Sequence, residues 1–340
     1  MAAHSDRGAR RRRPAANPFS GVRLHVVTGK GGTGKTTTAA ALALSLASGG
    51  RSVLLLEVEG RQGIAQLFDV PPLPYEERKV AVGIDGGDVH ALAIDPEDAL
   101  YEYLDMYYRL GRAGKALRRA GVVEFATTIA PGVRDVLLTG KAFEAVRRKE
   151  GPSHVYDAVV LDAPPTGRIT RFLNVNSEVA GLAKVGPIRR QADNIMGLLR
   201  SPATAVHLVT LLEEMPTQET IDGVGALRAT GLPVGGVVVN MVREPLLGSA
   251  ALQAAGKGTL DRAEVESGVA AAGLEGHAGV VDALLTEASD HAERVRLQRA
   301  ERRRLRSLQL PMLELPWLAD GVDLSGLYEL AGALRRQGVS

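Results

Sequence analysis

The clearest absence from this sequence is cysteine, of which its 340 residues contain none. A chain without thiols forms no disulfide, holds no thiolate zinc site and has no cysteine nucleophile. Aromatic residues make up only 4% of the chain. No uninterrupted apolar run approaches the roughly 18 residues that suggest a membrane-spanning helix. We therefore expect a cytoplasmic protein that binds no zinc and does not cross a membrane.

Excess charge of one sign is also lacking, because 41 Lys and Arg residues face 39 Asp and Glu residues. Residues 1–20 are the exception. Five arginines against Asp6 give this segment a net charge of +4, and it has no apolar periodicity. We predict a disordered basic tail over 1–20. With no second basic or aromatic patch beside the tail, we expect no contact with nucleic acid or membrane.

The strongest motif lies where the chain passes from a predicted strand at 22–27 into a small-residue helix. Gly29, Gly34, Lys35 and Thr36 match the phosphate-loop pattern G-x-x-x-x-G-K-[ST] in the required strand–turn–helix context. Backbone N–H groups of such a loop surround phosphate oxygens, the lysine reaches the β- and γ-phosphates, and the hydroxyl binds Mg²⁺. The residues predicted to hold ATP here are Gly29, Gly31, Gly32, Thr33, Gly34, Lys35, Thr36 and Thr37.

A second motif follows an apolar run at 158–161. Asp162 would emerge at the carboxyl end of a buried strand, where a Walker-B aspartate holds Mg²⁺ together with the phosphate-loop hydroxyl. We therefore assign Thr36 and Asp162 to the metal. Gly167, shortly after this strand, can bring a backbone N–H close to the γ-phosphate because it carries no side chain.

Two strings resemble a known family. The form Gly-Lys-Gly-Gly-Thr-Gly-Lys-Thr over 29–36, with Lys30 after the first glycine, resembles the deviant-Walker ATPases. The string Asp-Ala-Pro-Pro-Thr-Gly-Arg-Ile-Thr-Arg-Phe-Leu over 162–173 resembles the second switch of arsenite-pump (ArsA) and tail-anchored-protein targeting ATPases. The resemblance extends from about residue 21 to the C-terminus. It implies ATP hydrolysis in a dimer, in which Lys30 crosses the interface to the partner's nucleotide.

The resemblance also implies a first-switch aspartate that positions the attacking water, and this position falls on Glu59. The predicted strand at 53–59 places Glu57 and Glu59 on one side at its carboxyl end. A glutamate is one methylene longer, which could move the carboxylate by about 1 Å, and misplacement of that size can cost on the order of 10²-fold in rate. We expect Lys30, Lys35 and Glu59 to be catalytic, with slow turnover. The alternative is that Glu59 only caps the following turn.

Further strands at 205–211, 234–239 and 311–316 complete the predicted fold. This is an α/β fold of the P-loop NTPase type, with a mostly parallel sheet, helices on both faces and a helical insertion. We predict one domain over 21–340, with helical insertions near 95–150 and 178–203. In the resembling proteins an asparagine after the fifth strand recognises adenine and a proline loop flanks it, which here implies Asn240 and Pro316.

The insertions raise the question of a client. Tail-anchor targeting ATPases bind clients in a helical groove that is often rich in methionine, and Met106, Met196 and Met215 are the residues available here. His207, within an apolar run, is expected to be a core histidine rather than a ligand. A thiolate-bound metalloid is excluded because soft metalloids prefer sulfur.

The sequence thus predicts a Mg·ATP-dependent switch that works as a homodimer, or as a heterodimer with a paralogous ATPase, and couples nucleotide state to an unknown client protein. Two alternatives stay open. One is a partition or positioning ATPase that acts on DNA or membrane. The other is a weakly hydrolysing ATP-binding scaffold paired with an active paralogue.

Overall fold

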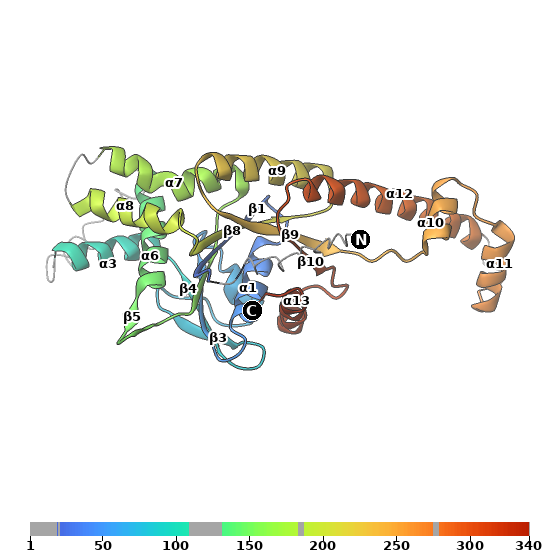
Figure 1. Ribbon diagram of the computed structural model, residues 1–340. Coiled ribbons are helices and arrows are strands. Elements are labelled where there is room, and N and C mark those ends of the chain that lie inside the picture. Colours follow the sequence, from blue (N-terminus) through green and yellow to red (C-terminus); the bar gives the residue numbers. More distant parts are fainter. Residues whose placement is uncertain (1–18, 20, 109–130, 183–186, 275–278, 340) are drawn as a thin grey trace, which may run out of the picture.

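The computed structural model describes residues 19, 21–108, 131–182, 187–274 and 279–339. These residues form an eight-stranded sheet with the order β10-β9-β8-β1-β7-β2-β4-β3, in which only β3 runs antiparallel to its neighbour (Figure 1). The strands are β1 (Leu24–Gly29), β2 (Ser52–Glu57), β3 (Arg78–Val82), β4 (Asp88–Ala93), β7 (Ala158–Asp162), β8 (Thr204–Thr210), β9 (Val234–Val242) and β10 (Met312–Pro316). A short hairpin of β5 (Lys149–Glu150) and β6 (Ser153–His154) lies apart from this sheet.

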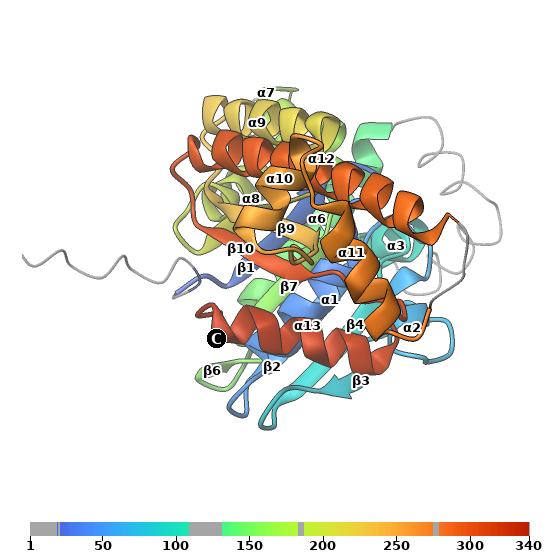
Figure 2. The ribbon, with the colours of Figure 1, turned by 90° about the vertical axis from the view of Figure 1, so that its right-hand side faces the viewer.

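Helices cover both faces of the sheet, and each face has its own apolar cluster. One face is covered by α1 (Lys35–Leu46), α2 (Gly63–Leu67) and α13 (Leu324–Arg336). The other is covered by α6 (Pro131–Arg147), α7 (Thr166–Leu182), α8 (Pro187–Leu199) and α9 (Glu214–Ala229). The end-on view of Figure 2 separates the two layers, with α9 on one side of the sheet and α1 and α13 on the other. The predicted α/β fold class is confirmed.

Helix α1 is buried along nearly its whole length, because small residues allow it to lie close to the central strands. Every residue from Thr38 to Leu46 is buried, and most of them are alanine, leucine or threonine. Its position fixes the phosphate loop, since the loop is the direct connection from β1 into this helix.

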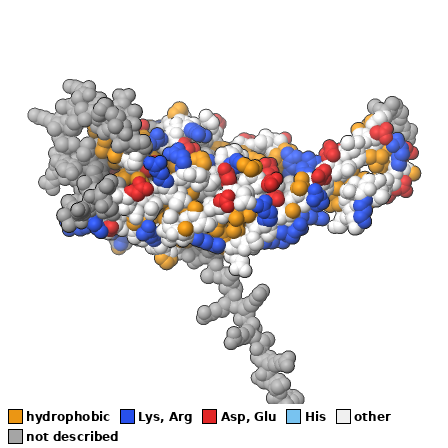
Figure 3. All heavy atoms as spheres, turned by 90° about the horizontal axis from the view of Figure 1, so that it is seen from above, with side chains coloured by type: hydrophobic (Ala, Val, Ile, Leu, Met, Phe, Trp, Pro, Cys, Tyr) orange, Lys and Arg blue, Asp and Glu red, His pale blue; other side chains and the backbone are white. Residues whose placement is uncertain are grey.

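An arm of α10 (Ser249–Gly256), α11 (Arg262–Ala271) and the long α12 (Val280–Arg306) extends from the sheet (Figures 1 and 2). Its buried apolar cluster is small, consisting of Leu252, Ala255, Ala292 and Val295, and α11 has no buried residue. Seen from above, Lys and Arg side chains gather where the arm leaves the body (Figure 3). None of the helices in the described ranges is long and apolar enough to cross a membrane.

The two edges of the sheet, formed by β3 and β10, have different surroundings. At one edge, β3 and β4 lie before the predicted helical insertion near 95–150, in a stretch for which no strand was predicted. At the other edge, the side chain of Gln337 occupies the free side of β10. Its amide oxygen accepts from the Glu314 backbone N–H (2.9 Å) and its amide nitrogen donates to the Glu314 carbonyl (2.8 Å).

Two histidines are stacked inside the central strands. His25 Nδ1 and His207 Nε2 are 3.1 Å apart, and the Phe19 ring stacks on both imidazoles. Both histidines are fully buried. Burial lowers the pKa of His207 to about 4, and burial and the neighbouring His207 lower the pKa of His25 as well. The prediction of a core histidine at 207 is confirmed.

Candidate nucleotide site

The phosphate loop follows β1, where the chain needs backbone conformations that favour glycine. Gly32 and Gly34 have φ values of 84° and 82°. A Cβ at Gly29 would overlap the Val209 carbonyl oxygen of β8, whereas a Cβ at Gly31 would meet no atom within 4 Å. The glycines therefore have different roles. Gly29 and Gly34 permit close packing, while Gly31 and Gly32 leave open space where phosphates can approach.

Asn240 reaches the phosphate loop from β9. Its Nδ2 donates to the Thr33 carbonyl oxygen at 3.0 Å, and a Cβ at Gly34 would overlap the same nitrogen. Asn240 is buried and ends the part of β9 that pairs with β8, because the next residue, Met241, has a positive φ of 56°. The structure thus brings Asn240 beside the loop, although residues 33 and 240 lie far apart in the sequence.

Thr36 and Asp162 meet as the motifs predicted. Thr36 Oγ1, in the first turn of α1, donates to Asp162 Oδ2 at 2.6 Å. Asp162 ends β7, where it pairs with Val27 of β1. The other carboxylate oxygen, Asp162 Oδ1, is buried without a hydrogen-bond partner among the described residues. Burial raises the pKa of Asp162 to about 6, against the hydrogen bond from Thr36 and the charge of Lys35, and the nearby Glu57 and Glu59 raise it further.

An unpartnered buried carboxylate oxygen beside a hydroxyl fits a Mg²⁺ site, since Mg²⁺ takes oxygen ligands in octahedral geometry. The described residues contain no group of three or more His, Asp or Glu side chains that could hold a metal by themselves. The protein would therefore supply two oxygens, and phosphate and water the rest, which is how Mg²⁺ is usually bound with nucleotides.

The two glutamates after β2 have different environments. The prediction that the strand continues to Glu59 is wrong, because β2 ends at Glu57. Glu57 is buried and accepts from the backbone N–H of Ile64 at 3.2 Å and, at 3.4 Å, from that of Gly63, so it caps α2. Glu59 lies in the loop, 23% exposed, with Arg61 Nε at 3.8 Å from its carboxylate. Of the two, Glu59 is the carboxylate that is free to act on a ligand.

Lys30 lies at the surface of the loop and contacts α9. Its Nζ is 3.9 Å from Glu219 Oε1, with both side chains about a third exposed (31% and 41%). At this distance in partly solvated surroundings the ion pair contributes about 0–1 kcal/mol, so the lysine is not held firmly.

Pro316 ends β10 opposite Val242 of β9, close in sequence register to Asn240. The sequence reasoning did not identify the two residues that complete this corner. Arg243 places its guanidinium 3.9 Å from the centroid of the Trp317 ring, and the backbone N–H of Trp317 donates to the Val242 carbonyl at 2.9 Å. Trp317 is the only tryptophan in the chain and directly follows Pro316, which was the available signal. Gly167 lies exposed in the first turn of α7.

A pocket of about 190 Å³ adjoins Glu59. It is bounded by the loops after β2 and β7 and by the first turns of α6 and α7. Its lining residues are Val58, Glu59, Arg61, Arg134, Asp135, Leu138, Pro164 and Arg168. The loop after β7 is tied to β1, because Thr28 Oγ1 donates to the Pro164 carbonyl at 2.7 Å.

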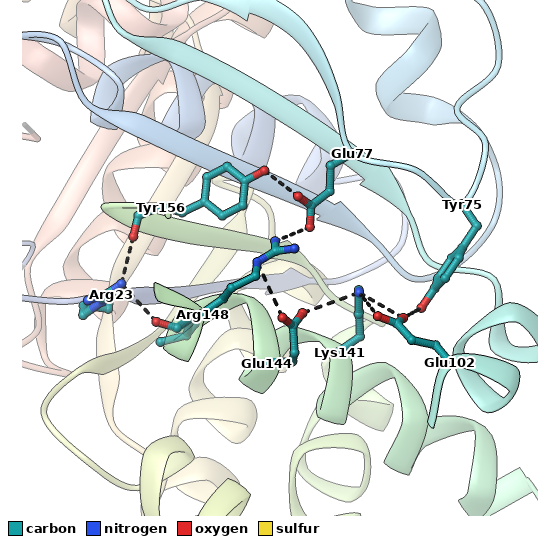
Figure 4. A network of polar contacts seen from close by, with 9 residues as sticks. Arg23, Tyr75, Glu77, Glu102, Lys141, Glu144, Arg148 and Tyr156 are labelled. Carbon is teal, nitrogen blue, oxygen red and sulfur yellow. Dashed lines mark hydrogen bonds and ion pairs between the residues drawn. The ribbon is translucent and has the colours of Figure 1, made fainter. Parts of the chain in front are cut away.

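The other end of α6 belongs to a network of polar contacts shown in Figure 4. Lys141 donates to Glu102 of α3 (Pro96–Tyr108) at 2.7 Å and lies 3.4 Å from Glu144. Arg148, just after α6, lies 3.5 Å from Glu144 and also pairs with Glu77. Although burial opposes its ionisation, hydrogen bonds from Lys141 and Tyr75 lower the pKa of Glu102. These contacts join α3 to α6.

The network continues to the sheet. Glu77 accepts from the Tyr156 hydroxyl at 2.7 Å, and Arg23 donates to the carbonyls of Tyr156 (2.8 Å) and Val146 (3.0 Å). Arg23 directly precedes β1, so the contacts run from α3 to the strand that leads into the phosphate loop.

The three methionines considered for a client groove lie in different surroundings. Met196 is buried in the core beside α6 and α7, so it does not line an exposed groove. Met215 is exposed on α9. The side chain of Met106 and the basic tail over 1–20, apart from Phe19, lie outside the described residues, as does part of the predicted insertion near 95–150.

Comparison with known proteins gives one consistent result. A family model described as anion-transporting ATPase (ArsA) matches residues 22–203. ATPase BagA of Mycobacterium tuberculosis (strain ATCC 25618 / H37Rv) is 56% identical over 322 residues, which are 94% of this chain and 95% of that protein. ATPase get3 of Neurospora crassa is 31% identical over 203 residues, 59% of this chain and 57% of that protein. With a family model that covers more than half of it and a relative that matches nearly all of it, this chain is an ATPase of the ArsA family.

Proposed function

We propose that this ATPase is a Mg·ATP-dependent dimeric switch of the cytoplasm that couples its nucleotide state to the binding of a client protein. The observation that supports this most directly is the Thr36–Asp162 pair with its unpartnered, buried Asp162 Oδ1. Thr36 and Asp162 would hold Mg²⁺ there, and the ion would supply positive charge that offsets the negative charge developing during hydrolysis. Lys35 would contact the same phosphates from the start of α1.

Lys30 is proposed to act in the partner's site. Its contact with Glu219 is long and partly solvated, so breaking that contact costs little free energy. A lysine on a phosphate loop that faces the corresponding loop of a second subunit would add positive charge to the partner's phosphates, where charge develops in the transition state.

Glu59 is proposed to position the attacking water. It is the partly exposed carboxylate on the loop after β2, whereas Glu57 is already used to cap α2. Asn240 is proposed to read the adenine ring. Its Nδ2 is held by Thr33, which leaves its carbonyl oxygen to accept from the adenine amino group, with Pro316 flanking the base.

Helix α6 is proposed to transmit the nucleotide state. Its first turn contributes Arg134 and Asp135 to the pocket beside Glu59, and its last turns hold Glu102 of α3 through Lys141. Movement of the loop after β2 would therefore shift α6 as a rigid unit and carry α3 with it. The helices around α3 are the proposed client-binding region.

The test is ATPase activity and molecular mass measured together, by phosphate release and light scattering, with and without Mg·ATP. We expect nucleotide-dependent dimers for the wild type. Lys30→Ala should still bind ATP but lose about 10²-fold or more in kcat, as does loss of one preorganised donor. Lys257→Ala, an exposed lysine just after α10, is the matched control and should behave as the wild type. Full activity of a monomeric Lys30→Ala protein would disprove the dimeric mechanism.

Glu59→Gln in the same assay should lower kcat with little change in ATP affinity, because the amide keeps the size but cannot accept the proton of water as a carboxylate does. Activity that appears only after mixing with a paralogous ATPase would instead favour a heterodimer in which this chain is the weakly hydrolysing subunit.

A further inference from the structure

The pocket beside Glu59 is separate from the phosphate loop but adjoins it. None of its lining residues belongs to the loop over 29–37. Pro164, which lines the pocket, lies two residues beyond Asp162. The loop after β2 also lines the pocket, and β2 is the strand that pairs with β7. The pocket is therefore next to the place where the terminal phosphate of ATP would lie, on the side away from the glycines.

The guanidinium groups of this pocket make few direct hydrogen bonds to the protein, although the charge of Asp135 attracts Arg134 and Arg168. Arg134 donates one hydrogen bond, to the Val58 carbonyl at 3.3 Å, and Arg61 pairs with Glu59 only at 3.8 Å. Within the described ranges the guanidinium of Arg168 has neither a hydrogen bond nor an ion pair, and only its backbone N–H donates, to the Pro165 carbonyl. Guanidinium groups in a concave site with free N–H donors are suited to bind an oxyanion.

The pocket also contains carboxylates, which restrict the anion that it can accept. Glu59 and Asp135 face the same space as the arginines. An ionised carboxylate can only accept hydrogen bonds, so it repels an anion without a proton and attracts one that carries an O–H group. Inorganic phosphate near neutral pH carries one or two protons, whereas sulfate carries none.

We propose that this pocket is the first binding site of the inorganic phosphate after ATP hydrolysis releases it from the nucleotide site. Arg134 and Arg168 donate to its oxygens and Asp135 accepts from its O–H group. The proposal rests on ATP being hydrolysed at the phosphate loop. The pocket would be a second anion site, which the phosphate occupies as it leaves the nucleotide site. It would also connect the nucleotide site to the start of α6, because Arg134 and Asp135 line it.

The test is isothermal titration of sodium phosphate into protein saturated with Mg·ADP, so that the phosphate loop is already occupied. We expect the wild type to bind one phosphate per chain. Arg168→Gln and Arg134→Gln should each weaken this binding about tenfold or more, since each removes a charge-assisted contact. Arg299→Gln, at an exposed arginine of α12 outside the pocket lining, is the matched control and should bind phosphate as the wild type does.

Sulfate in place of phosphate gives an independent test. The wild type should bind sulfate at least tenfold more weakly than phosphate, and Asp135→Asn should reduce this preference because an amide can donate to an unprotonated oxygen. Phosphate binding that is absent, that is equal in both arginine variants and the wild type, or that shows no preference over sulfate would overturn the proposal. If Mg·ADP itself failed to bind, the nucleotide-site assignment would fall, while the arginine dependence of phosphate binding would still decide this inference.

Discussion

Two of the places where the described residues bury unpartnered polar atoms have opposite consequences. At the carboxyl end of β7, Asp162 Oδ1 has no partner, but the surrounding loop is open to a ligand. Within the central strands, His25 Nε2 and His207 Nδ1 also lack partners among the described residues, but Phe19 covers both rings. The first place keeps an acceptor ready for a metal ion. The second is closed, so its histidines stay neutral and serve packing alone.

The comparison predicts that substitutions at the open end, around Asp162 and the phosphate loop, change activity. Substitutions at the closed site, formed by His25 and His207, should change stability. Lys35→Ala should reduce ATPase activity by about 10²–10³-fold, as expected when one preorganised donor to a developing charge is removed. Phosphate-release kinetics measure this. The melting temperature without nucleotide should change little, because Lys35 is partly exposed. A large loss of stability in this variant would contradict the distinction between the two places.

The closed site should make the protein sensitive to acid. The folded pKa of His207 is about 4, below its ordinary value of about 6.5, so protons bind preferentially to the unfolded chain between these values. The contribution of His207 should therefore be complete above pH 6.5 and fall by about 3 kcal/mol as the pH drops to 4, and the lowered pKa of His25 adds to the loss in the same direction. Urea unfolding over this range measures the loss. His207→Leu should make the profile shallower, with the share of His25 remaining, while ATPase activity at pH 8 is unchanged, and an equally steep profile in this variant would refute the assignment.

Two glycines of the phosphate loop sharpen the comparison at the open end. Gly34→Ala should destabilise the nucleotide-free protein by about 1–3 kcal/mol, because the residue has a positive φ and its Cβ would overlap the Asn240 amide. Gly31→Ala meets no atom within 4 Å and should be nearly neutral in the same unfolding assay. Similar stability of the two variants would show that Asn240 does not hold the loop.

The smallest effect should be a gain in stability at the metal position. Because the folded pKa of Asp162 is about 6, above that of the unfolded chain, its ionisation opposes folding as the pH rises from about 4 to 6. Asp162→Asn should then stabilise the metal-free, nucleotide-free protein at pH 8 by about 1–2 kcal/mol. The difference should shrink towards pH 4. Destabilisation at pH 8 would mean that the carboxylate is stabilised in the folded chain by contacts other than Thr36.

The sequence predicted those parts of the site that depend on local order along the chain. The phosphate loop and Asp162 were found because glycine spacing and an apolar run report a strand end and the turn after it. The end of β2 was misplaced by two residues, because Glu57 turns to cap α2, a contact with residues that follow in the chain. Turn chemistry of this kind is not encoded in apolar periodicity.

The parts that sequence reasoning missed depend on contacts between distant segments. The Asn240–Thr33 bond, the Lys30–Glu219 pair and the Arg243–Trp317 stack join residues separated by dozens to hundreds of positions. The network around Glu102 and the guanidinium pocket likewise combine helices and loops whose proximity follows only from the sheet order. Strands β3 and β4 were missed because no strand was predicted between the strand at 53–59 and the helical insertion near 95–150.

At the free edge of β10, the side-chain amide of Gln337 takes the place that one peptide group of a neighbouring strand would occupy. By filling both the donor and the acceptor of Glu314, it leaves an incoming strand from another molecule without a pair of bonds at that point. In chains truncated before Gln337, the free edge of β10 would be open to pairing with a strand of another molecule. Their failure would appear as aggregation during purification, even with the nucleotide chemistry intact.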